Sequence, residues 1–245
     1  MRIGFLGALC AVFALTLQAQ AARPSLSVQT AAGVVKITPI YHACALIQAA
    51  GKNIYVDPAS PANFTGLPGA DLIIITDIHP DHMDPGSIAT ISKAGTEILA
   101  PAAVAKTVTK AKVISNGQTT SWDSWTVHAI PMYNLKRGPS PGELYHPKGR
   151  GNGYVLTYGG KRIYFSGDTE NIPEMRALKN IDLAFVCMNL PYTMPPDEAA
   201  AAVKAFHPKM VVPYHYHGSD LSVFKKDLQG TGIDVRIFDW YPKEP

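Results

Sequence analysis

The stretch Thr76–Pro85 reads TDIHPDHMDP and directly follows the apolar run Leu72–Ile75. Such a run is typical of a strand that is covered on both faces. A loop at the end of a strand can direct alternate side chains at a common point, and imidazole and carboxylate groups are ligands for Zn, Mn or Fe. The alternative is a turn with capping aspartates and incidental histidines, and it accounts for Asp84 alone, which precedes Pro85 and a predicted helix. The spacing therefore predicts a metal site whose first ligands are Asp77, His79, Asp81 and His82.

One loop seldom supplies a complete metal site, so we expect further ligands from distant parts of the chain. Asp168 follows a predicted strand and Gly167, a residue that lets the backbone turn tightly. His215 follows another predicted strand. His146 lies in Lys136–Gly153, a long loop rich in glycine and proline, and such loops often form lids or binding loops. The additional candidate ligands are His146, Asp168 and His215.

The composition describes a folded protein of 245 residues, because 47% of them are hydrophobic and only 17% are charged. The formal net charge of +3 is small, and the basic residues do not cluster into a stripe. We therefore expect a small-molecule substrate and no nucleic-acid partner.

The N-terminus has the pattern of a signal peptide. Arg2 is followed by the apolar run Ile3–Leu17, and Ala19-Gln20-Ala21 has the small-x-small form of a cleavage site. A transmembrane anchor is the alternative, but the run is shorter than the ~20 residues that span a bilayer. Cys10 could indicate a lipoprotein, yet Leu9 before it is not the small residue usual there. We predict a signal peptide at residues 1–21, one domain at 22–245, a periplasmic or secreted product, and no stable membrane insertion after cleavage.

Short strands and helices alternate along the rest of the chain. Strands are predicted over Val34–Ile40, Cys44–Gln48, Asn53–Val56, Leu72–Thr76, Ile98–Leu99, Val113–Ile114, Trp125–Ile130, Tyr154–Tyr158, Arg162–Phe165, Leu183–Met188, Met210–Pro213 and Val235–Phe238. Helices are predicted after Asp84, within Pro101–Thr109, and over Asp197–Phe206 and Ser219–Gln229. The sequence GKNIYVD at 51–57 is echoed by GKRIYF at 160–165, which SGD follows at 166–168. A duplicated unit of this kind implies two sheets packed together with helices outside.

These motifs, in this order, resemble the metallo-β-lactamase-fold hydrolase superfamily, whose signature is HxHxDH, a later histidine, a bridging aspartate and a final histidine. The branch it resembles includes UlaG-type lactonases and N-acyl-phosphatidylethanolamine phospholipase D. The motifs that point to this branch are Tyr41-His42-Ala43, Tyr133-Asn134 and His146-Pro147-Lys148-Gly149. The resemblance implies an α+β fold, a four-layer αβ/βα sandwich of two mixed β-sheets with outer helices.

Two departures from the signature affect the first of the two metal sites that the resemblance implies. Asp77 replaces a histidine, which favours Mn or Fe over Zn because a carboxylate is the harder ligand. Asn134 stands where the later histidine is expected, so that either His146 substitutes for it or the site is weakened. The better-preserved second site would consist of Asp81, His82, Asp168 and His215.

The resemblance implies two divalent ions, Zn or Mn with Fe as a further possibility, that hold a bridging hydroxide. Asp81 would both ligate and orient this nucleophile. The residues that could stabilise an oxyanion or protonate the leaving group are Asn134, Tyr216 and His217, for each of which packing is an equal alternative. For His42 we expect a hydrogen bond near the site.

The function predicted is an exported metal-dependent hydrolase of a small ester, lactone, amide or phosphodiester. The alternative is a metal-binding but catalytically idle sensor or carrier, which Asp77 and Asn134 would favour. A true β-lactamase is a narrower and weaker interpretation. The sequence leaves open whether Cys44 and Cys187 pair or stay separate.

Overall fold

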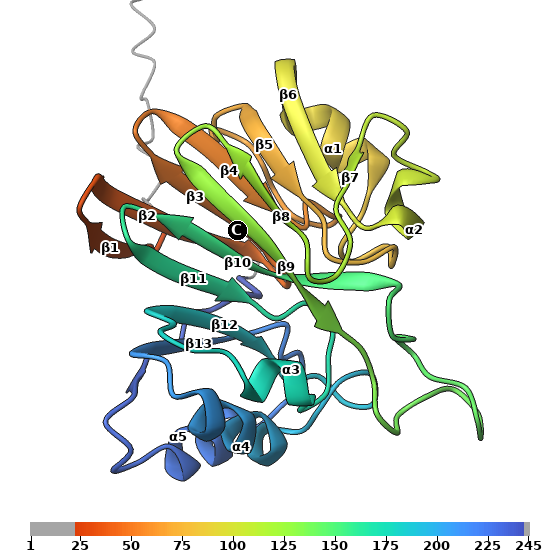
Figure 1. The fold of residues 1–245 in the computed structure, drawn as a ribbon, viewed down its shortest axis with the longest axis vertical. Coiled ribbons are helices and arrows are strands. Elements are labelled where there is room, and N and C mark those ends of the chain that lie inside the picture. The colour runs from red at the N-terminus through yellow and green to blue at the C-terminus, as the bar shows by residue number, and fades with distance from the viewer. Residues whose placement is uncertain (1–22, 243–245) are drawn as a thin grey trace, which may run out of the picture.

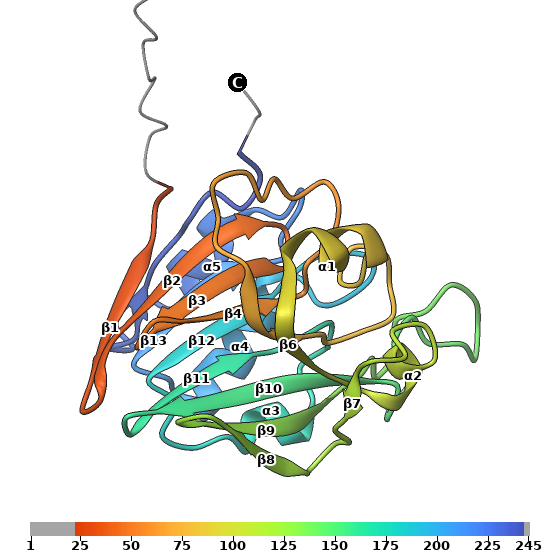
Figure 2. The same cartoon turned by 90° about the horizontal axis from the view of Figure 1, so that it is seen from above.

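Two seven-stranded β-sheets pack against each other in the computed structural model, which describes residues 23–242 (Figures 1 and 2). The first sheet consists, in spatial order, of β1 (Leu26–Thr30), β2 (Gly33–Tyr41), β3 (Cys44–Ala49), β4 (Lys52–Val56), β5 (Ala70–Ile74), β6 (Ser92–Ala100) and β7 (Lys112–Val113). The second consists of β14 (Asp234–Val235), β13 (Met210–Tyr214), β12 (Leu183–Cys187), β11 (Lys161–Phe165), β10 (Gly151–Tyr158), β9 (Trp125–Met132) and β8 (Thr119–Trp122). The predicted signal peptide lies outside the described residues.

The two halves of the chain repeat one topology. In the first sheet, β4 pairs antiparallel with β3 and parallel with β5. In the second sheet, β11 pairs antiparallel with β10 and parallel with β12. Gly51 and Gly160 form the two hairpin turns, with φ values of 74° and 80° that only glycine adopts readily. The sequence echo therefore corresponds to a structural repeat, and both sheets are mixed as predicted.

Helices cover the outer faces of both sheets. They are α1 (Pro85–Ile91), α2 (Ala102–Ala105), α3 (Pro173–Arg176), α4 (Pro196–Phe206) and α5 (Leu221–Asp227). Figure 1 shows α3, α4 and α5 below the second sheet. Figure 2 shows α1 beside the first sheet, on the face that is turned away from the second sheet. The apolar side chains between the sheets form one core cluster, and Ile88 and Ile91 of α1 belong to a second cluster outside the first sheet. The four-layer sandwich expected from the sequence is confirmed.

The local signals that start α1 act as expected. Asp84 is its N-cap, and the carboxylate accepts hydrogen bonds from Gly86 N at 3.2 Å and Ser87 N at 3.0 Å. Pro85 occupies the first turn, where its missing N–H has no cost. The capping interpretation of Asp84 is thus correct.

The structure contains strands that the sequence did not predict and changes the bounds of some predicted elements. The strands β1 and β8 were not predicted, because they lie at sheet edges and alternate between half-buried and exposed residues without a strong apolar signal. The helix α5 is shorter than the predicted range Ser219–Gln229. It begins at Leu221, because Asp220 is its N-cap and accepts a hydrogen bond from Ser222 N. The strand β14 ends at Val235 instead of Phe238, since the chain then turns so that Trp240 is fully buried.

The two cysteines of the described chain are free and buried. Cys44 packs in the cluster outside the first sheet, whereas Cys187 belongs to the core between the sheets. Of the two alternatives, separate buried thiols are therefore correct. Within residues 23–242, no helix is both long and apolar enough to cross a membrane.

Candidate metal centre

The candidate ligands come from the ends of strands that meet at one edge of the sandwich. Asp77 follows β5, Asp168 follows β11, and His215 follows β13. In Figure 1, β11 and β12 run toward the edge from which the loop between β9 and β10 projects, and that loop carries His146. The fold therefore brings together side chains that are far apart in the sequence.

Asp168 lies at the centre of this group. Its Oδ2 atom is 3.2 Å from His82 Nε2 and 3.2 Å from His146 Nε2, and its Oδ1 atom is 3.3 Å from His215 Nε2. All four side chains are almost completely buried. Three imidazoles thus surround one carboxylate in an environment from which water is largely excluded.

The donor atoms of this group have no hydrogen-bond partners. Among the described residues, His82 Nε2, His146 Nε2, His215 Nε2 and Asp168 Oδ1 are buried and unsatisfied. An unpaired buried polar atom costs free energy, and several that converge on one point indicate a missing partner. The set fits a divalent cation, and His82, Asp168 and His215 offer ligand atoms that all lie within 4.8 Å of one another.

His82 is held by a second carboxylate on its other side. Its Nδ1 atom lies 2.8 Å from Asp57 Oδ2, and Asp57 also accepts from the backbone N and the hydroxyl of Thr76 at 2.7 Å each. A hydrogen bond of this kind fixes the orientation of the ring and leaves Nε2 to face the site. Asp57 follows β4 as Asp168 follows β11, so the echoed aspartates have different tasks.

The opposite charges of His82 and Asp168 stabilise each other. Burial lowers the pKa of His82, but the carboxylates of Asp168 and Asp57 outweigh it and hold the pKa well above its usual value. Burial raises the pKa of Asp168, but His215 and His82 hold it well below its usual value. In the absence of a cation, the positive charge on His82 compensates the carboxylates, and a bound cation would take over that role.

A second group of potential ligands surrounds Asp77. The ligand atoms of Asp77, His79 and His146 also lie within 4.8 Å of one another. However, Arg150 donates to both oxygens of Asp77, from Nε at 3.1 Å and from Nη2 at 2.7 Å. A buried carboxylate and a guanidinium therefore form a bidentate ion pair inside this group.

Asn134 orients His146 and does not face the cation group. Its Oδ1 atom lies 2.6 Å from His146 Nδ1 and accepts from His146 N at 2.8 Å. Its Nδ2 atom donates to Glu170 Oε1 at 3.0 Å and to Tyr192 O at 2.9 Å. Both the oxygen and the nitrogen of the Asn134 side chain are therefore hydrogen-bonded. The structure places the imidazole of His146, and not the amide of Asn134, toward the position where the altered signature lacks a histidine.

Asp81 lies at the rim, with a side chain that is 46% exposed. Its Oδ2 atom is 3.1 Å from His42 Nε2 and 3.4 Å from His215 Nε2. His42 Nδ1 in turn lies 2.7 Å from the hydroxyl of Tyr241. His42 forms the hydrogen bond near the site that the sequence predicts.

The directions of the pKa shifts indicate the protonation states of His42 and Asp81. Burial, together with the nearby His215 and His82, lowers the pKa of His42 to about 4. Burial raises the pKa of Asp81, but the neighbouring imidazoles of His215 and His42 hold it well below its usual value. At neutral pH a neutral His42 therefore donates from Nε2 to an ionised Asp81 and accepts from Tyr241 at Nδ1.

The structure places the other two sequence-predicted catalytic candidates outside the buried group. The Tyr216 hydroxyl donates to the carbonyl oxygen of Phe238 at 2.9 Å. His217 is exposed, and its ring packs edge-on against Tyr241 with the centroids 5.1 Å apart. In this arrangement both side chains have structural partners.

One candidate ligand and two supporting residues of the site have an unusual backbone. Asp57, His42 and His215 have φ values of 45°, 54° and 48°, in the left-handed region that is costly for residues other than glycine. Gly167, which precedes Asp168, has φ of 59°, and a Cβ atom there would lie 3.1 Å from the carbonyl oxygen of Asn152. Strained backbone and close packing thus fix the directions of these side chains.

Sequence reasoning missed three residues of the site. In the sequence Asp57 is visible only as the echo of Asp168, and Arg150, beside His146, is open to two interpretations, a hint of phosphodiester cleavage or a solvated loop charge. Glu170 is almost fully buried and accepts from the backbone N of Arg137 at 2.8 Å, which ties the long loop to the site. Two signals could have indicated these residues. Glu170 is a charged residue in a buried segment, and Arg150 is only four positions from His146 in the sequence.

Comparisons with known proteins identify the family of this chain. Residues 36–215 match the model of a beta-lactamase superfamily domain. A UPF0173 metal-dependent hydrolase of Ligilactobacillus salivarius is 32% identical over 220 residues, which cover 79% of this chain and 93% of that protein. The crystal structure of a protein of Parabacteroides distasonis described as a metal-dependent hydrolase has a TM-score of 0.84 and 43% identity, and the match covers 88% of this chain and 98% of that one.

A more distant structure shows the fold alone. Igni18, a metallo hydrolase of Ignicoccus hospitalis, matches with a TM-score of 0.69 at 22% identity over 83% of this chain and 94% of that one.

Proposed function

Because this chain belongs to the beta-lactamase superfamily and groups with its metal-dependent hydrolases, we propose that it hydrolyses a small ester, lactone, amide or phosphodiester outside the cytoplasm. The observation that supports this proposal most strongly is the set of buried, unpaired donor atoms around Asp168. Such atoms are poorly suited to a passive core and well suited to a catalytic cation.

The residues that would hold the cation are His82, Asp168 and His215, with His146 directed at the same carboxylate. A bound divalent ion would activate a water molecule and polarise an oxygen of the substrate. Asp57 keeps His82 in one tautomer, and Asn134 does the same for His146. The chain therefore presents preoriented imidazoles, which lowers the cost of binding the ion.

Asp81 is the group best placed to manage a proton. It is ionised, partly open to solvent, and near both His82 and His215. It can accept a hydrogen bond from an attacking water and orient it toward the substrate. His42, backed by Tyr241, keeps the carboxylate in place and can pass a proton between the site and solvent.

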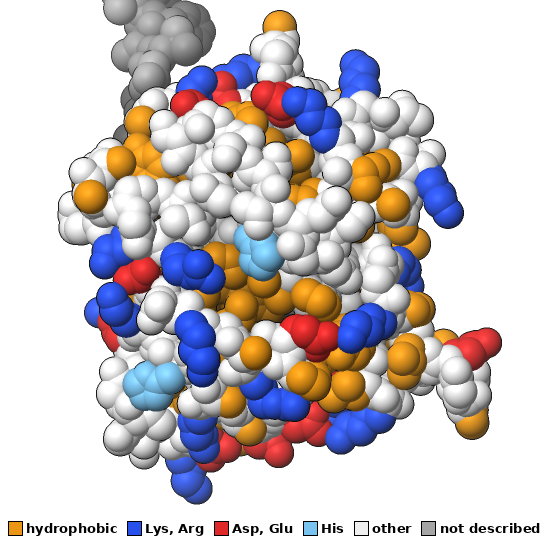
Figure 3. Space-filling view, in the orientation of Figure 1, with side chains coloured by type: hydrophobic (Ala, Val, Ile, Leu, Met, Phe, Trp, Pro, Cys, Tyr) orange, Lys and Arg blue, Asp and Glu red, His pale blue; other side chains and the backbone are white. Residues whose placement is uncertain are grey.

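The basic residues of the long loop Lys136–Gly153 pair with acidic residues of the chain itself. Lys148 pairs with Glu174 at 2.7 Å, and Arg150 pairs with Asp77. On the face shown in Figure 3, lysines and arginines alternate with acidic residues and do not form a single stripe. These pairings favour a small substrate of low charge over a polyanion, and a lactone or ester is thus a better candidate than a nucleic acid.

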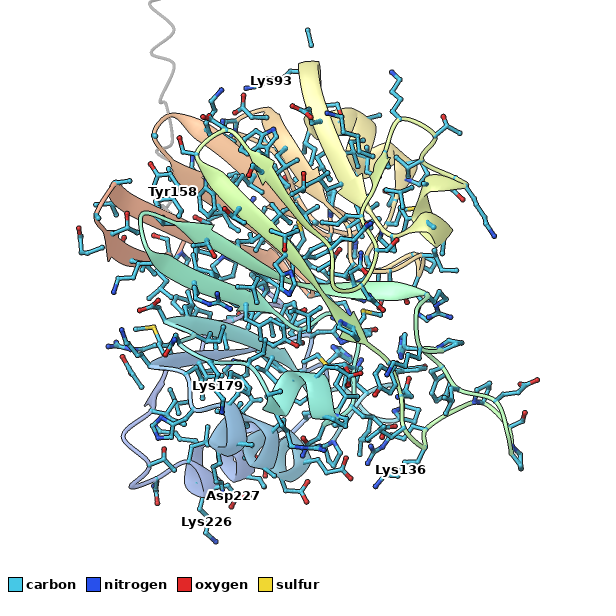
Figure 4. The ribbon with its side chains drawn as sticks, in the orientation of Figure 1. Lys93, Lys136, Tyr158, Lys179, Lys226 and Asp227 are labelled. Atoms are coloured by element: carbon cyan, nitrogen blue, oxygen red, sulfur yellow. The ribbon has the colours of Figure 1, made fainter. Side chains whose placement is uncertain are left out.

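A hydrolysis panel tests this proposal. The purified chain, loaded with Zn or with Mn, is assayed on lactone, ester, amide, phosphodiester and β-lactam substrates, before and after a chelator. We expect turnover of one class, which the chelator abolishes and added metal restores. Asp168→Asn should abolish turnover, whereas Asp227→Asn at the end of α5, which Figure 4 labels far from the strand ends, should not.

The ion pair of Asp77 and Arg150 favours a second candidate, a metal-binding but catalytically idle module. In that case the chain would bind metal with the same dependence on Asp168 but would turn over no substrate of the panel. Metal binding and turnover therefore need to be measured on the same samples.

Export is a separate part of the proposal. Arg2, the apolar run Ile3–Leu17 and the small residues around Gln20 support cleavage after Ala21. Mass spectrometry of the protein recovered from the periplasm or medium should give an N-terminus at Ala22. An intact N-terminus in a cytoplasmic fraction would contradict export without affecting the catalytic proposal.

A further inference from the structure

Arg150 binds both oxygens of a fully buried carboxylate near the site, that of Asp77. Asp77 has no exposed side-chain surface, and its two oxygens accept from Nε and Nη2 of the same guanidinium. A fork-shaped donor that matches a carboxylate in this way is the strongest form of ion pair in proteins. The two oxygens with which Asp77 would bind a metal therefore face the guanidinium of Arg150.

The same guanidinium also engages His79. Its Nη2 atom lies 3.1 Å from His79 Nε2, and the other ring nitrogen, Nδ1, lies 3.3 Å from Asp77 Oδ2. Both nitrogens of His79 thus have neighbours within the ion pair. Two of the three residues in this potential metal group have their ligand atoms occupied by partners from the chain itself.

The group around Asp168 has the opposite property. His82 Nε2, His215 Nε2 and Asp168 Oδ1 are buried without partners, whereas no atom of Asp77 is in that state. His146 Nε2 is also unpartnered, and it lies closer to Asp168 Oδ2, at 3.2 Å, than to Asp77 Oδ2, at 3.9 Å. The two groups therefore differ in their need for a cation, although both contain suitable residue types.

We propose that the guanidinium of Arg150 replaces the second divalent ion, so that the chain binds a single ion among His82, Asp168 and His215. This inference rests on the metal centre of the proposed function. It revises the pair of ions that the motif order implies, because the residues around Asp77 do not fit a divalent cation while Arg150 is present. A second ion would share the carboxylate of Asp77 with a fixed positive charge, and like charges at this separation repel.

The proposal assigns different tasks to His79 and His146. His146, freed from a site at Asp77, lies 3.2 Å from Asp168 Oδ2 and positions the carboxylate that binds the single ion. His79, with a half-exposed ring beside Arg150, stabilises the ion pair. A site with two ions would require both histidines as ligands of the same ion.

Metal counting on the purified full chain tests the proposal. The protein is stripped with a chelator, saturated with Zn or with Mn, separated from free ions by gel filtration, and analysed by mass spectrometry of the elements. We expect one tightly held ion in the unaltered chain and two in Arg150→Met, whose side chain is similar in length but uncharged. Arg236→Met removes a surface charge that pairs only with Asp234, and it should keep one ion.

Second-site variants identify where the gained ion binds. Asp77→Asn added to Arg150→Met should return the count to one, since the new site loses its carboxylate. His79→Ala alone should leave the count at one, whereas His146→Ala should weaken binding of the single ion by ten- to a hundredfold. Circular dichroism spectra of every variant establish that the counts refer to folded protein.

The outcomes separate this inference from the proposed function. Two ions in the unaltered chain, or one ion in folded Arg150→Met, would overturn the replacement by Arg150 and leave the hydrolase proposal intact. No tightly held ion in the unaltered chain would overturn both. Should Arg150→Met fail to fold, the count in the unaltered chain and the contrast between His79→Ala and His146→Ala still decide the matter.

Discussion

The Nδ1 atom of His146 lies 2.6 Å from Oδ1 of Asn134, and this contact explains how an altered signature can retain a metal-binding imidazole. The amide oxygen accepts a hydrogen bond from Nδ1–H and leaves the lone pair on Nε2 for the site. Glu170 fixes the amide in this orientation by accepting from Nδ2. The asparagine stands where a histidine ligand is expected, and it positions an imidazole that comes from twelve residues further along the chain.

Asn134→Ala should therefore weaken metal binding without abolishing it. The ring of His146 would lose its orientation, and such a loss typically reduces metal affinity by about ten- to a hundredfold. Competition with a chromophoric chelator measures the change. Asn63→Ala, at an exposed position between β4 and β5, is the control and should have no effect. Equal affinities for Asn134→Ala and the unaltered chain would show that the orientation of His146 does not contribute to metal binding.

Asp57 is predicted to contribute more to stability than a surface aspartate. Asp57→Ala would remove the buried carboxylate beside Nδ1 of His82 and leave the N–H of Thr76 unpaired in the interior. Removal of one partner from a buried charged pair costs about 3–5 kcal/mol. Urea denaturation of the metal-free protein measures this loss. Asp71→Ala, which removes a partly exposed carboxylate that accepts from Asn53 N, should cost roughly 1 kcal/mol.

The cysteines should be unreactive while the protein is folded. Burial, together with the nearby charge of Asp168, raises the pKa of the Cys187 thiol to about 12, and burial raises the pKa of Cys44 still further. A thiol reagent at pH 8 should label neither residue until denaturant is added, because the thiolate is the reactive form. Mass spectrometry under non-reducing conditions should show two free thiols in the mature chain. A disulfide between them would contradict the packing of the two core clusters.

The ion pair between Arg137 and Glu198 predicts a dependence of stability on pH. Arg137 donates to both oxygens of Glu198 at 2.8 and 2.9 Å, and these hydrogen bonds lower the pKa of Glu198 to about 2. Since this value is below that of the unfolded chain, the contribution is present above the unfolded pKa of ~4.3 and is lost as the pH falls toward 2.

Glu198→Gln should thus reduce the free energy of unfolding by about 1 kcal/mol at pH 7, a figure reduced for solvent screening at this partly exposed pair. The difference from the unaltered chain should narrow as the pH is lowered from 5 to 3, measured by urea denaturation at each pH. Lys136 also contacts Glu198, at 2.9 Å, and Figure 4 labels it beside the loop. Because its charge is exposed, Lys136→Met should have a smaller effect. A difference that widens at low pH would contradict the assignment.

The positions that the sequence predicted well are those with a local signal. Asp168 and His215 each follow an apolar strand, and parallel strands end at the same edge of a sheet, so their convergence follows from the order of the elements. Asp84 was predictable as a cap because the following proline marks the start of α1. The repeat of the two halves was visible because both hairpins keep the same turn glycine.

The role of Arg150 could not be predicted because it depends on a contact between distant residues. It is 73 positions from Asp77, in a loop whose composition suggests solvent exposure. Glu170 presented the same difficulty, since its partners Asn134 and Arg137 precede it by more than thirty residues. Tyr216 and His217 follow His215 and therefore seemed close to the chemistry, but the turn after β13 directs them to Phe238 and Tyr241.

The central claim is that a divalent cation binds at the buried carboxylate of Asp168, and an anomalous-scattering map of metal-loaded crystals tests it most directly. The account predicts a strong peak within about 2.0–2.3 Å of His82 Nε2, His215 Nε2 and an oxygen of Asp168. The absence of a peak at Asp168 after saturation with Zn or Mn, or a peak bound only by Asp77 and His79, would contradict it.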